Sequence, residues 1–531
     1  MLRLGAFLPA ILLLSSVGGC GDCNPLTAGQ VGAPGFVFST AAEFDEGTLT
    51  NLVHDGPTGG QLKLSGSTQT FPFIWIALSA RGTICKIDTN TGEILGEYRT
   101  APETEGFSNP SRTTVSLNGS AWAGNRAAAS VVHVGLIEAN QAVDRNGNGV
   151  IDTSTGYGDV RPWPNASGVD SDGGVETAED ECILHFVRTS ATATRHVTVN
   201  ADNNVWASGR FGSNDAVFDL IDGETGAILR TEGPFNAGGY GGVIDRNGVL
   251  WSASSDGNLL RWDPNAPLSG TNPTYIGVPN YGLAVDGFGN IWVTALSGNL
   301  VSKLAPDGTL LGSFQHGSNN AQGLAIDSNN HVWVSSSLVG LDTVGHLLND
   351  GTFLGNVAGV GSGSTGVAID SNGKIWTANI VASNATRIDP SAGPIGSDGV
   401  TPIGAVDLTV DLPGASPYNY SDMTGAVALS TTNPQGTWRV VKNSGAAGTE
   451  WTRIVWNTQP EGQEPPGSSI TLEARAADTV VALGGKSFLP VSNGVVFSLV
   501  GQHIEVRVKL TPNGSGASPV LSDVAVHFRT P

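Results

Sequence analysis

The stretch AVDRNGNGVIDTSTG, residues 142–156, has the spacing of a calcium-binding loop. Oxygen-bearing side chains stand at its first, third, fifth and ninth positions, and a glycine at the sixth permits the sharp turn that lets alternate oxygens converge. The twelfth position is Thr155, where a bidentate Glu is usual, so we expect the last ligand to come from outside the loop. The predicted calcium ligands are Asp144, Asn146, Asn148, Val150 through its carbonyl, Asp152 and Asp159.

This loop lies in residues 140–185, a stretch without obvious strands that also contains a second group of acids. A connection of this length needs something to order it. Outside the cell, calcium is abundant enough to fill even a weak site. We therefore interpret calcium as a structural cofactor that orders the insertion. The alternative is an Asn/Gly turn among scattered acidic residues.

A second candidate site is basic. Arginine or histidine recurs ten residues before and four residues after two tryptophans, Trp122 and Trp206. The predicted ligand-binding residues are Arg112, Arg126, Arg195, His196 and Arg210. Such a group on a chain of net charge −21 suits a carboxylate, sulfate or phosphate, because Arg can donate two parallel N–H groups to an anion.

Two alternatives compete with this anion site. The arginines could instead pair with acids of the insertion, Glu179, Asp180 and Glu181, and so hold it over the site. His196 is a candidate general base, although no Ser/His/Asp or Cys/His arrangement is identifiable around it.

An internal repeat must position these residues. In segments such as YGLAVDGFGNIWVTAL, an apolar strand ends at an Asp, a Gly/Asn turn follows, and a second strand carries a Trp six residues after that Asp. The repeats are centred on Trp75, Trp122, Trp206, Trp251, Trp292, Trp333 and Trp376. Successive tryptophans lie 41 to 47 residues apart, except for 84 residues between Trp122 and Trp206. This period predicts a seven-bladed β-propeller in which Trp fills the core and Asp caps the turns.

The rhythm G-[LV]-A-[IV]-D-x-x-x-x-[IV]-W resembles NHL-type propellers and, more closely, the streptogramin (virginiamycin B) lyase propellers. The resemblance covers residues 70 to 411 and implies a metal-assisted His/Glu constellation. Those lyases commonly carry Glu just after the Trp strand, whereas the matching stretches here, such as WVTA and WTAN, contain none. This departure argues against lyase activity.

The N-terminal residues MLRLGAFLPAILLLSSVGGC are typical of a bacterial signal peptide. The ending VGGC resembles a lipobox, which implies that Cys20 is lipidated; an ordinary secretory signal is the alternative. Either predicts an envelope protein, anchored by lipid and facing the periplasm or the outside, or else secreted. Of the remaining cysteines, we expect Cys85 and Cys182 to form a disulfide.

Alternating strands in residues 418–531 predict a β-sandwich, and its final strands resemble galactose-binding-like accessory domains. Residues 36–66 could supply the first strands of this sandwich, so that the propeller is inserted into it. The alternative is that residues 36–70 close the propeller ring with an extra strand. The predicted organisation is a signal peptide (1–19), a tether (20–35), possible sandwich strands (36–66), a propeller (67–417) and a sandwich (418–531).

The predicted fold class is all-β. The sequence leaves two kinds of function for the protein, binding and catalysis. We favour a surface lipoprotein whose propeller binds a protein or glycan partner. The alternative is a metal-dependent, streptogramin-lyase-like enzyme acting at the propeller mouth. The acidic charge argues against a nucleic-acid partner.

Overall fold

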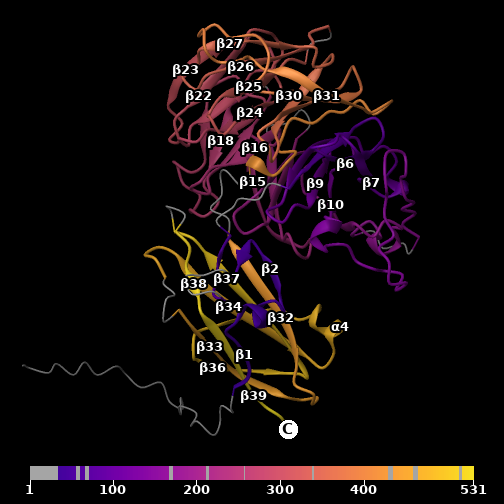
Figure 1. Ribbon diagram of the computed structural model, residues 1–531, viewed down its shortest axis with the longest axis vertical. Coiled ribbons are helices and arrows are strands. Elements are labelled where there is room, and N and C mark those ends of the chain that lie inside the picture. Colours follow the sequence, from indigo (N-terminus) through magenta and orange to yellow (C-terminus); the bar gives the residue numbers. More distant parts are fainter. Residues whose placement is uncertain are drawn as a thin grey trace, which may run out of the picture.

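The chain is all-β, with a ring of β-sheets and a separate β-sandwich (Figure 1). The computed structural model describes residues 34–54, 60–65, 71–166, 171–210, 215–255, 257–337, 340–427, 435–458, 464–513 and 517–531. The signal peptide and Cys20 lie outside these residues. Within the described parts of the chain, no helix is long and apolar enough to cross a membrane.

Seven antiparallel sheets follow one another along the chain and form the blades of the propeller. The first three blades are β5 (Phe73–Leu78), β6 (Thr83–Asp88) and β7 (Ile94–Arg99); β8 (Pro110–Val115), β9 (Ala121–Asn125), β10 (Ser130–Val134) and β11 (Ile183–Arg188); and β12 (Thr194–Val199), β13 (Val205–Gly209), β14 (Ala216–Ile221) and β15 (Ile228–Phe235). The next two are β16 (Gly241–Ile244), β17 (Leu250–Ala253), β18 (Leu259–Trp262) and β19 (Thr274–Ile276); and β20 (Leu283–Val285), β21 (Ile291–Thr294), β22 (Leu300–Leu304) and β23 (Leu310–Gln315). The last two are β24 (Leu324–Ile326), β25 (Val332–Ser335), β26 (Thr343–Leu347) and β27 (Phe353–Ala358); and β28 (Ser364–Ile369), β29 (Ile375–Asn379), β30 (Asn384–Asp389) and β31 (Ala405–Asp411).

The chain that follows the seventh blade closes the ring. Blade one has three strands of its own, and residues 415–424 run beside its strand β5. The Trp75 N–H donates to the Met423 carbonyl at 2.8 Å, and the Tyr418 N–H donates to Ala77 at 3.2 Å. The prediction that the propeller ends at residue 417 is therefore wrong, because the pairing that closes the ring continues past it. The described strands between residues 34 and 64 pair with C-terminal strands instead, so they do not close the ring.

Each regular repeat is held by one aspartate. Asp370, for example, accepts the indole N–H of Trp376 at 2.9 Å through Oδ2. Its Oδ1 accepts the backbone N–H groups of Asn372 and Lys374, which form the turn. The same arrangement holds at Asp245, Asp286 and Asp327. The predicted roles of Asp as turn cap and of Trp as core are confirmed, and all seven repeat tryptophans are buried.

The sandwich is assembled from both ends of the chain. Strand β1 (Pro34–Phe38) pairs with β39 (Asp523–Arg529), β2 (Thr48–Thr50) with β32 (Gly436–Asn443), and β4 (Leu62–Leu64) with β38 (Val520–Leu521). In the sequence, the propeller is therefore inserted between the opening strands of the sandwich and its remaining strands. The other elements here are α2 (Ala41–Phe44), β3 (Leu52–Val53), β33 (Glu450–Asn457), β34 (Ser469–Ala477), α4 (Val480–Leu483), β35 (Leu489–Val491), β36 (Val496–Val500) and β37 (His503–Thr511).

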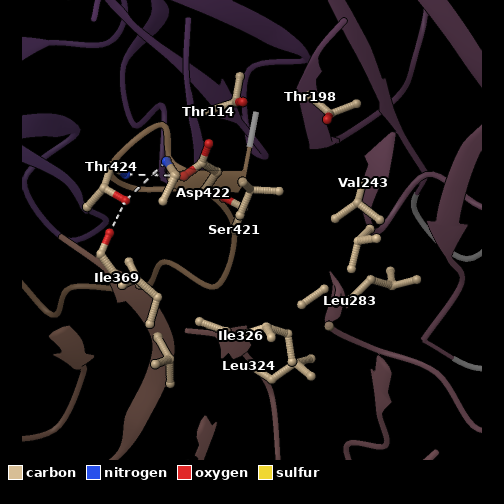
Figure 2. Close-up of a pocket in the computed structure, with 18 of the residues that line it drawn as sticks. Thr114, Thr198, Val243, Leu283, Leu324, Ile326, Ile369, Ser421, Asp422 and Thr424 are labelled. Atoms are coloured by element: carbon tan, nitrogen blue, oxygen red, sulfur yellow. Dashed lines mark hydrogen bonds between the residues drawn. The ribbon is translucent and has the colours of Figure 1, made fainter. Parts of the chain in front are cut away.

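The innermost strands of the blades surround a central channel (Figure 2). These strands begin at one end of the channel. At the other end they turn back through the Asp-capped turns. The two ends differ in character: aromatic and basic side chains gather at the first, and a cavity with a largely apolar lining opens at the second.

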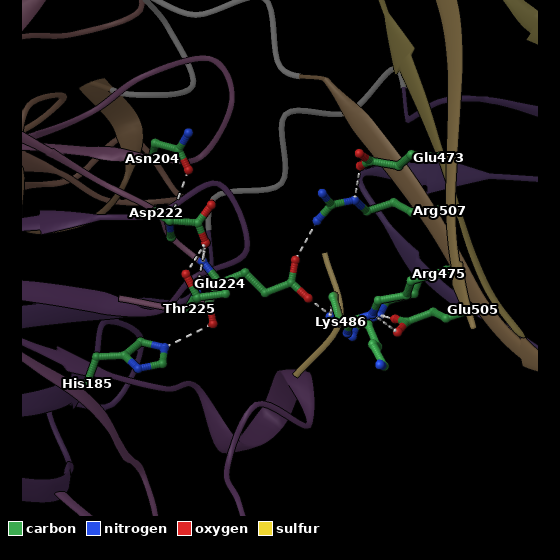
Figure 3. Close-up of polar contacts among 12 residues, drawn as sticks. His185, Asn204, Asp222, Glu224, Thr225, Glu473, Arg475, Lys486, Glu505 and Arg507 are labelled. Atoms are coloured by element: carbon green, nitrogen blue, oxygen red, sulfur yellow. Dashed lines mark hydrogen bonds and ion pairs between the residues drawn. The ribbon is translucent and has the colours of Figure 1, made fainter. Parts of the chain in front are cut away.

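Ion pairs join the propeller to the sandwich (Figure 3). Glu224, in the turn between β14 and β15, is bound by Arg439 and by Arg507, whose Nη1 lies 2.5 Å from its Oε2. Lys509 pairs with Asp202 of the same blade. The contact between the two domains at blade three is therefore ionic.

Candidate functional site

The basic residues predicted from the sequence occupy the channel end at which the inner strands begin. Arg112 lies on β8 and Arg195 on β12, while Arg126 directly follows β9 and Arg210 directly follows β13. Corresponding strands of successive blades start and end at the same height along the channel axis, so residues at matching positions in the repeat become neighbours in space. The Nε of Arg112 donates to the Arg195 carbonyl at 2.9 Å, which joins blades two and three.

Four tyrosines complete this group, and the sequence analysis did not single them out. They are Tyr240, Tyr281, Tyr418 and Tyr420, which are four of the seven tyrosines in the chain. The Tyr281 and Tyr418 hydroxyls lie 2.7 Å apart, and the Tyr420 hydroxyl donates to that of Tyr281 at 3.3 Å. Two of these tyrosines directly precede Gly241 and Gly282, which open inner strands, so the repeat register could have located them.

Each of three guanidinium groups packs on a tyrosine ring. Arg112 stacks on Tyr420. Arg126 lies 4.5 Å from the ring centre of Tyr418, and Arg195 lies 4.5 Å from that of Tyr240. A cation is attracted to the negative face of an aromatic ring, so the rings hold the guanidinium groups without neutralising their charge.

Arg112 is fully buried. Its Nε and Nη2 donate to the Tyr240 carbonyl, whereas its Nη1 has no hydrogen-bond partner among the described residues. Burial, with a smaller contribution from the charge of Arg195, lowers the pKa of Arg112 to about 9. At neutral pH the group is still protonated, and it holds a positive charge away from water.

The other two arginines are half-buried, and each has buried N–H groups that lack an acceptor among the described residues. The Nε of Arg126, and the Nε and Nη1 of Arg195, have no hydrogen-bond partner in the described part of the chain. Burial lowers the pKa of Arg126, and the neighbouring charge of Arg195 acts in the same direction. The ion pairs between described residues involve other arginines. Three cations thus share one site without a described carboxylate, which favours binding of an anion.

The alternative, in which these arginines hold the insertion, is wrong because the insertion is anchored by contacts of its own. The Glu181 carboxylate accepts backbone N–H groups of Arg145, Asn146 and Asp152 at 2.7 to 3.2 Å. The Asp180 carboxylate accepts from Thr153, Ser154 and Cys182. The Arg145 guanidinium donates to three carbonyls of residues 178–183.

The predicted calcium loop is a compact turn. Asp144 accepts the backbone N–H groups of Gly147 and Gly149 at 2.7 and 2.9 Å. The side-chain N–H groups of Asn146 and Asn148 donate to Asp152 Oδ2 at 2.7 and 2.8 Å. A cation centred among these side chains would require both amides to turn their oxygens inward.

The predicted outer ligands of the loop lie apart. Asp159 accepts the N–H and O–H of Thr155 in the next turn, whereas the Val150 N–H donates to Asn148 within the loop. Glu181 is the carboxylate that contacts the loop backbone, whereas the sequence analysis considered it only as a partner of the arginines. The described residues contain no cluster of three or more His, Cys, Asp or Glu side chains arranged for a metal ion.

His196 lies behind the arginines and is fully buried. Its Nδ1 lies 3.0 Å from the Ser252 hydroxyl, and its ring packs edge-on against Phe218. Burial lowers its pKa to about 3, so the ring is neutral. A general base must reach the substrate and have a pKa near the operating pH. The prediction of His196 as a candidate base is therefore wrong.

The predicted disulfide is also wrong, because Cys85 and Cys182 are both free and buried. Cys85 packs with Ile76 and Trp376 between blades one and seven, whereas Cys182 packs between blades one and two. The two thiols thus lie on opposite faces of the first blade. Side chains of alternate residues in a strand point to opposite faces, and spacing in the sequence could not reveal this separation.

Comparisons with known proteins yield no family model and no curated protein that matches the chain. Matching solved structures include virginiamycin B lyase from Staphylococcus aureus, with 12% identity, 62% of this chain and 91% of that chain covered, and a TM-score of 0.41. A functionally unknown protein from Desulfotomaculum acetoxidans has 13% identity, 66% and 98% coverage, and a TM-score of 0.44. A streptogramin B lyase structure has 18% identity, 46% and 78% coverage, and a TM-score of 0.34. At these values, the propeller assignment rests on the seven sheets themselves.

Proposed function

We propose that this protein is a binding protein whose propeller recognises an anionic group on a protein or glycan partner. The observation that carries this proposal is the site of Arg112, Arg126 and Arg195, in which no described carboxylate balances the three charges. A carboxylate, sulfate or phosphate at this end of the channel would supply the missing acceptors.

The three arginines have different roles in this proposal. Arg112 is held by two backbone carbonyls and a tyrosine ring, so it provides a fixed charge at the base of the site. Arg126 and Arg195 are nearer to solvent, and their N–H groups can donate directly to the ligand. Because tyrosine rings pre-position both side chains, little side-chain entropy is lost when the anion binds.

The test is calorimetric titration of the soluble protein with three probes: a chondroitin sulfate tetrasaccharide, an oligogalacturonate, and a peptide of alternating Asp and Glu. Loss of one charged hydrogen bond costs about 1.5–3 kcal/mol, which is roughly a 10- to 100-fold loss of affinity. We expect a loss of that order in Arg126→Ala and in Arg195→Ala for the probe that binds. Arg529→Ala, which removes a distant charge in the sandwich, should leave affinity unchanged.

Two outcomes would overturn the proposal. One is binding of no probe by the wild-type protein. The other is an equal loss of affinity in all three variants, because that would indicate attraction by overall charge. The probe that binds distinguishes a glycan from a protein partner.

We further propose that the protein is attached to the bacterial cell envelope through a lipid on Cys20, with secretion as the alternative, and that calcium orders the insertion. The support is the lipobox-like ending VGGC and the spacing of the loop that begins at Asp144. Growth with labelled palmitate should label the wild-type protein but not Cys20→Ser. Labelling of both, or of neither, would contradict lipidation at this residue.

A further inference from the structure

The other end of the channel contains a separate cavity of about 330 Å³. Turn residues Gly287 and Ser328 are exposed and contribute to its lining, so the cavity opens to solvent there. At its inner end it meets Tyr420 and Gly241. Tyr420 stacks on the buried Arg112, and Gly241 packs beneath the same guanidinium. The basic site thus borders the inner end of the cavity.

The walls of this pocket are of two kinds (Figure 2). One wall is aliphatic and comes from the inner strands of blades four to seven. Its labelled members are Val243, Leu283, Leu324, Ile326 and Ile369. The opposite wall is polar and comes from blades two and three and the ring-closing segment. Its members are Thr114, Thr198, Ser421, Asp422 and Thr424.

The polar wall mainly offers acceptors. The hydroxyl of Ser421 donates to the Thr113 carbonyl, and the hydroxyl of Thr424 donates to Ile369 at 2.6 Å. Both hydroxyl protons are therefore used, and the Ser421 oxygen also accepts the Thr113 N–H at 3.0 Å, so these groups can present only their remaining lone pairs to a ligand. The Asp422 carboxylate accepts the backbone N–H groups of Thr424 and Gly425 through Oδ1, at 3.2 and 2.9 Å, and can only accept while it is ionised. A ligand group that faces this wall should thus be a donor.

The aliphatic wall cannot hydrogen-bond to water, so the water that fills this part of the pocket is readily displaced by apolar surface. A volume near 300 Å³ is at the lower end of small-molecule pockets, enough for a two-ring body.

We infer that this pocket binds a compact apolar molecule that carries one alcohol or protonated amine. The apolar body lies against the wall of Leu324 and Ile326, and the donor group faces Thr198 and Asp422. The molecule enters through the mouth at Gly287 and Ser328. This site is distinct from the proposed anion site, which lies at the other end of the channel.

The test uses 2-(2-naphthyl)ethanol as the probe, with 2-propylnaphthalene and 2-naphthylacetate as matched compounds, in calorimetry or ligand-observed NMR. The alcohol should bind about ten-fold tighter than the propyl compound, the difference expected for one hydrogen bond. The acetate tests the charge preference of the pocket, because Arg246 also lines it; acetate that binds more tightly than the alcohol would overturn the inference.

Ile326→Trp should fill the pocket and reduce alcohol binding at least ten-fold, whereas Val400→Trp, at an exposed hairpin position, should not. Thr198→Val should abolish the preference for the alcohol over the propyl compound. This second variant decides the matter if Ile326→Trp does not fold. Arg529→Ala, in the sandwich, should leave alcohol binding unchanged. Unaltered binding in a folded Ile326→Trp protein, or unaltered preference in Thr198→Val, would overturn the inference.

Discussion

Replacing Asp370 by Ala should destabilise the propeller measurably, because this carboxylate holds both a turn and a buried indole. The variant loses the 2.9 Å bond from Trp376 and the bonds from the Asn372 and Lys374 amides. The Trp376 N–H is then left buried without a partner, which costs about 1–3 kcal/mol. The turn amides can recover hydrogen bonds with water and contribute about 1 kcal/mol more.

Asp398 provides the matched control. Its carboxylate also accepts two backbone N–H groups of a turn, from Val400 and Thr401, but binds no indole. Asp398→Ala should therefore cost about 1 kcal/mol, against about 3 kcal/mol for Asp370→Ala. For a propeller of this size, 3 kcal/mol corresponds to a fall in melting temperature of about 4 °C.

Denaturant unfolding followed by tryptophan fluorescence would measure both changes. A second pair of measurements, made in the Trp376→Phe background, isolates the indole bond. In that background, Asp370→Ala should cost no more than Asp398→Ala. Equal costs for the two variants in the wild-type background would refute the reasoning, because the indole bond would then contribute nothing.

Four further predictions concern other parts of the molecule. Burial lowers the pKa of His196 to about 3 and those of His316 and His346 to about 4, so each ring stays neutral in the folded protein while the unfolded chain takes up protons below pH 6.5. The free energy of unfolding is therefore highest above about pH 6.5 and falls toward pH 4, by about 2 kcal/mol per histidine between pH 7 and 5. Denaturant unfolding curves at pH 7 and pH 5 measure this fall. If His196→Asn lost as much stability between these pH values as the wild type, the prediction would be contradicted. Calcium should bind the wild-type protein and raise its melting temperature, but not in Asp144→Ala; a titration without heat would mean that hydrogen bonds alone order the insertion. The two buried thiols should be inert to a thiol-reactive dye until the protein unfolds, and labelling of the native protein would place a thiol at the surface. Glu224→Gln should weaken the contact between propeller and sandwich, which small-angle scattering at increasing salt would detect as a larger radius; identical curves would show that the ion pairs do not set the arrangement.

The repeat could be read from the sequence because its physics is local. The Asp, the turn and the Trp that bind one another lie within seven consecutive residues, as in Asp286 to Trp292. Because the contacting residues are so close in sequence, each blade shows the same Asp–turn–Trp spacing. The propeller fold and the number of its blades therefore follow from this spacing alone. The match of Arg112 with His196, and of Arg126 with Arg210, at equivalent repeat positions likewise predicted that these residues lie at one level of the ring.

Only the tertiary structure decided which distant segments meet. Closing the ring brings residues 415–424 beside β5, and that pairing places Tyr418 and Tyr420 among arginines some 300 residues earlier in the chain. The same dependence explains the two wrong predictions for the cysteines and the insertion acids. Composition and spacing describe what a segment can bind, whereas its actual partner is set by long-range packing that buries the largest apolar area. The repeat can therefore be recognised from the sequence alone. The basic and aromatic site is formed only when the ring closes and brings residues 415–424 beside the first blade.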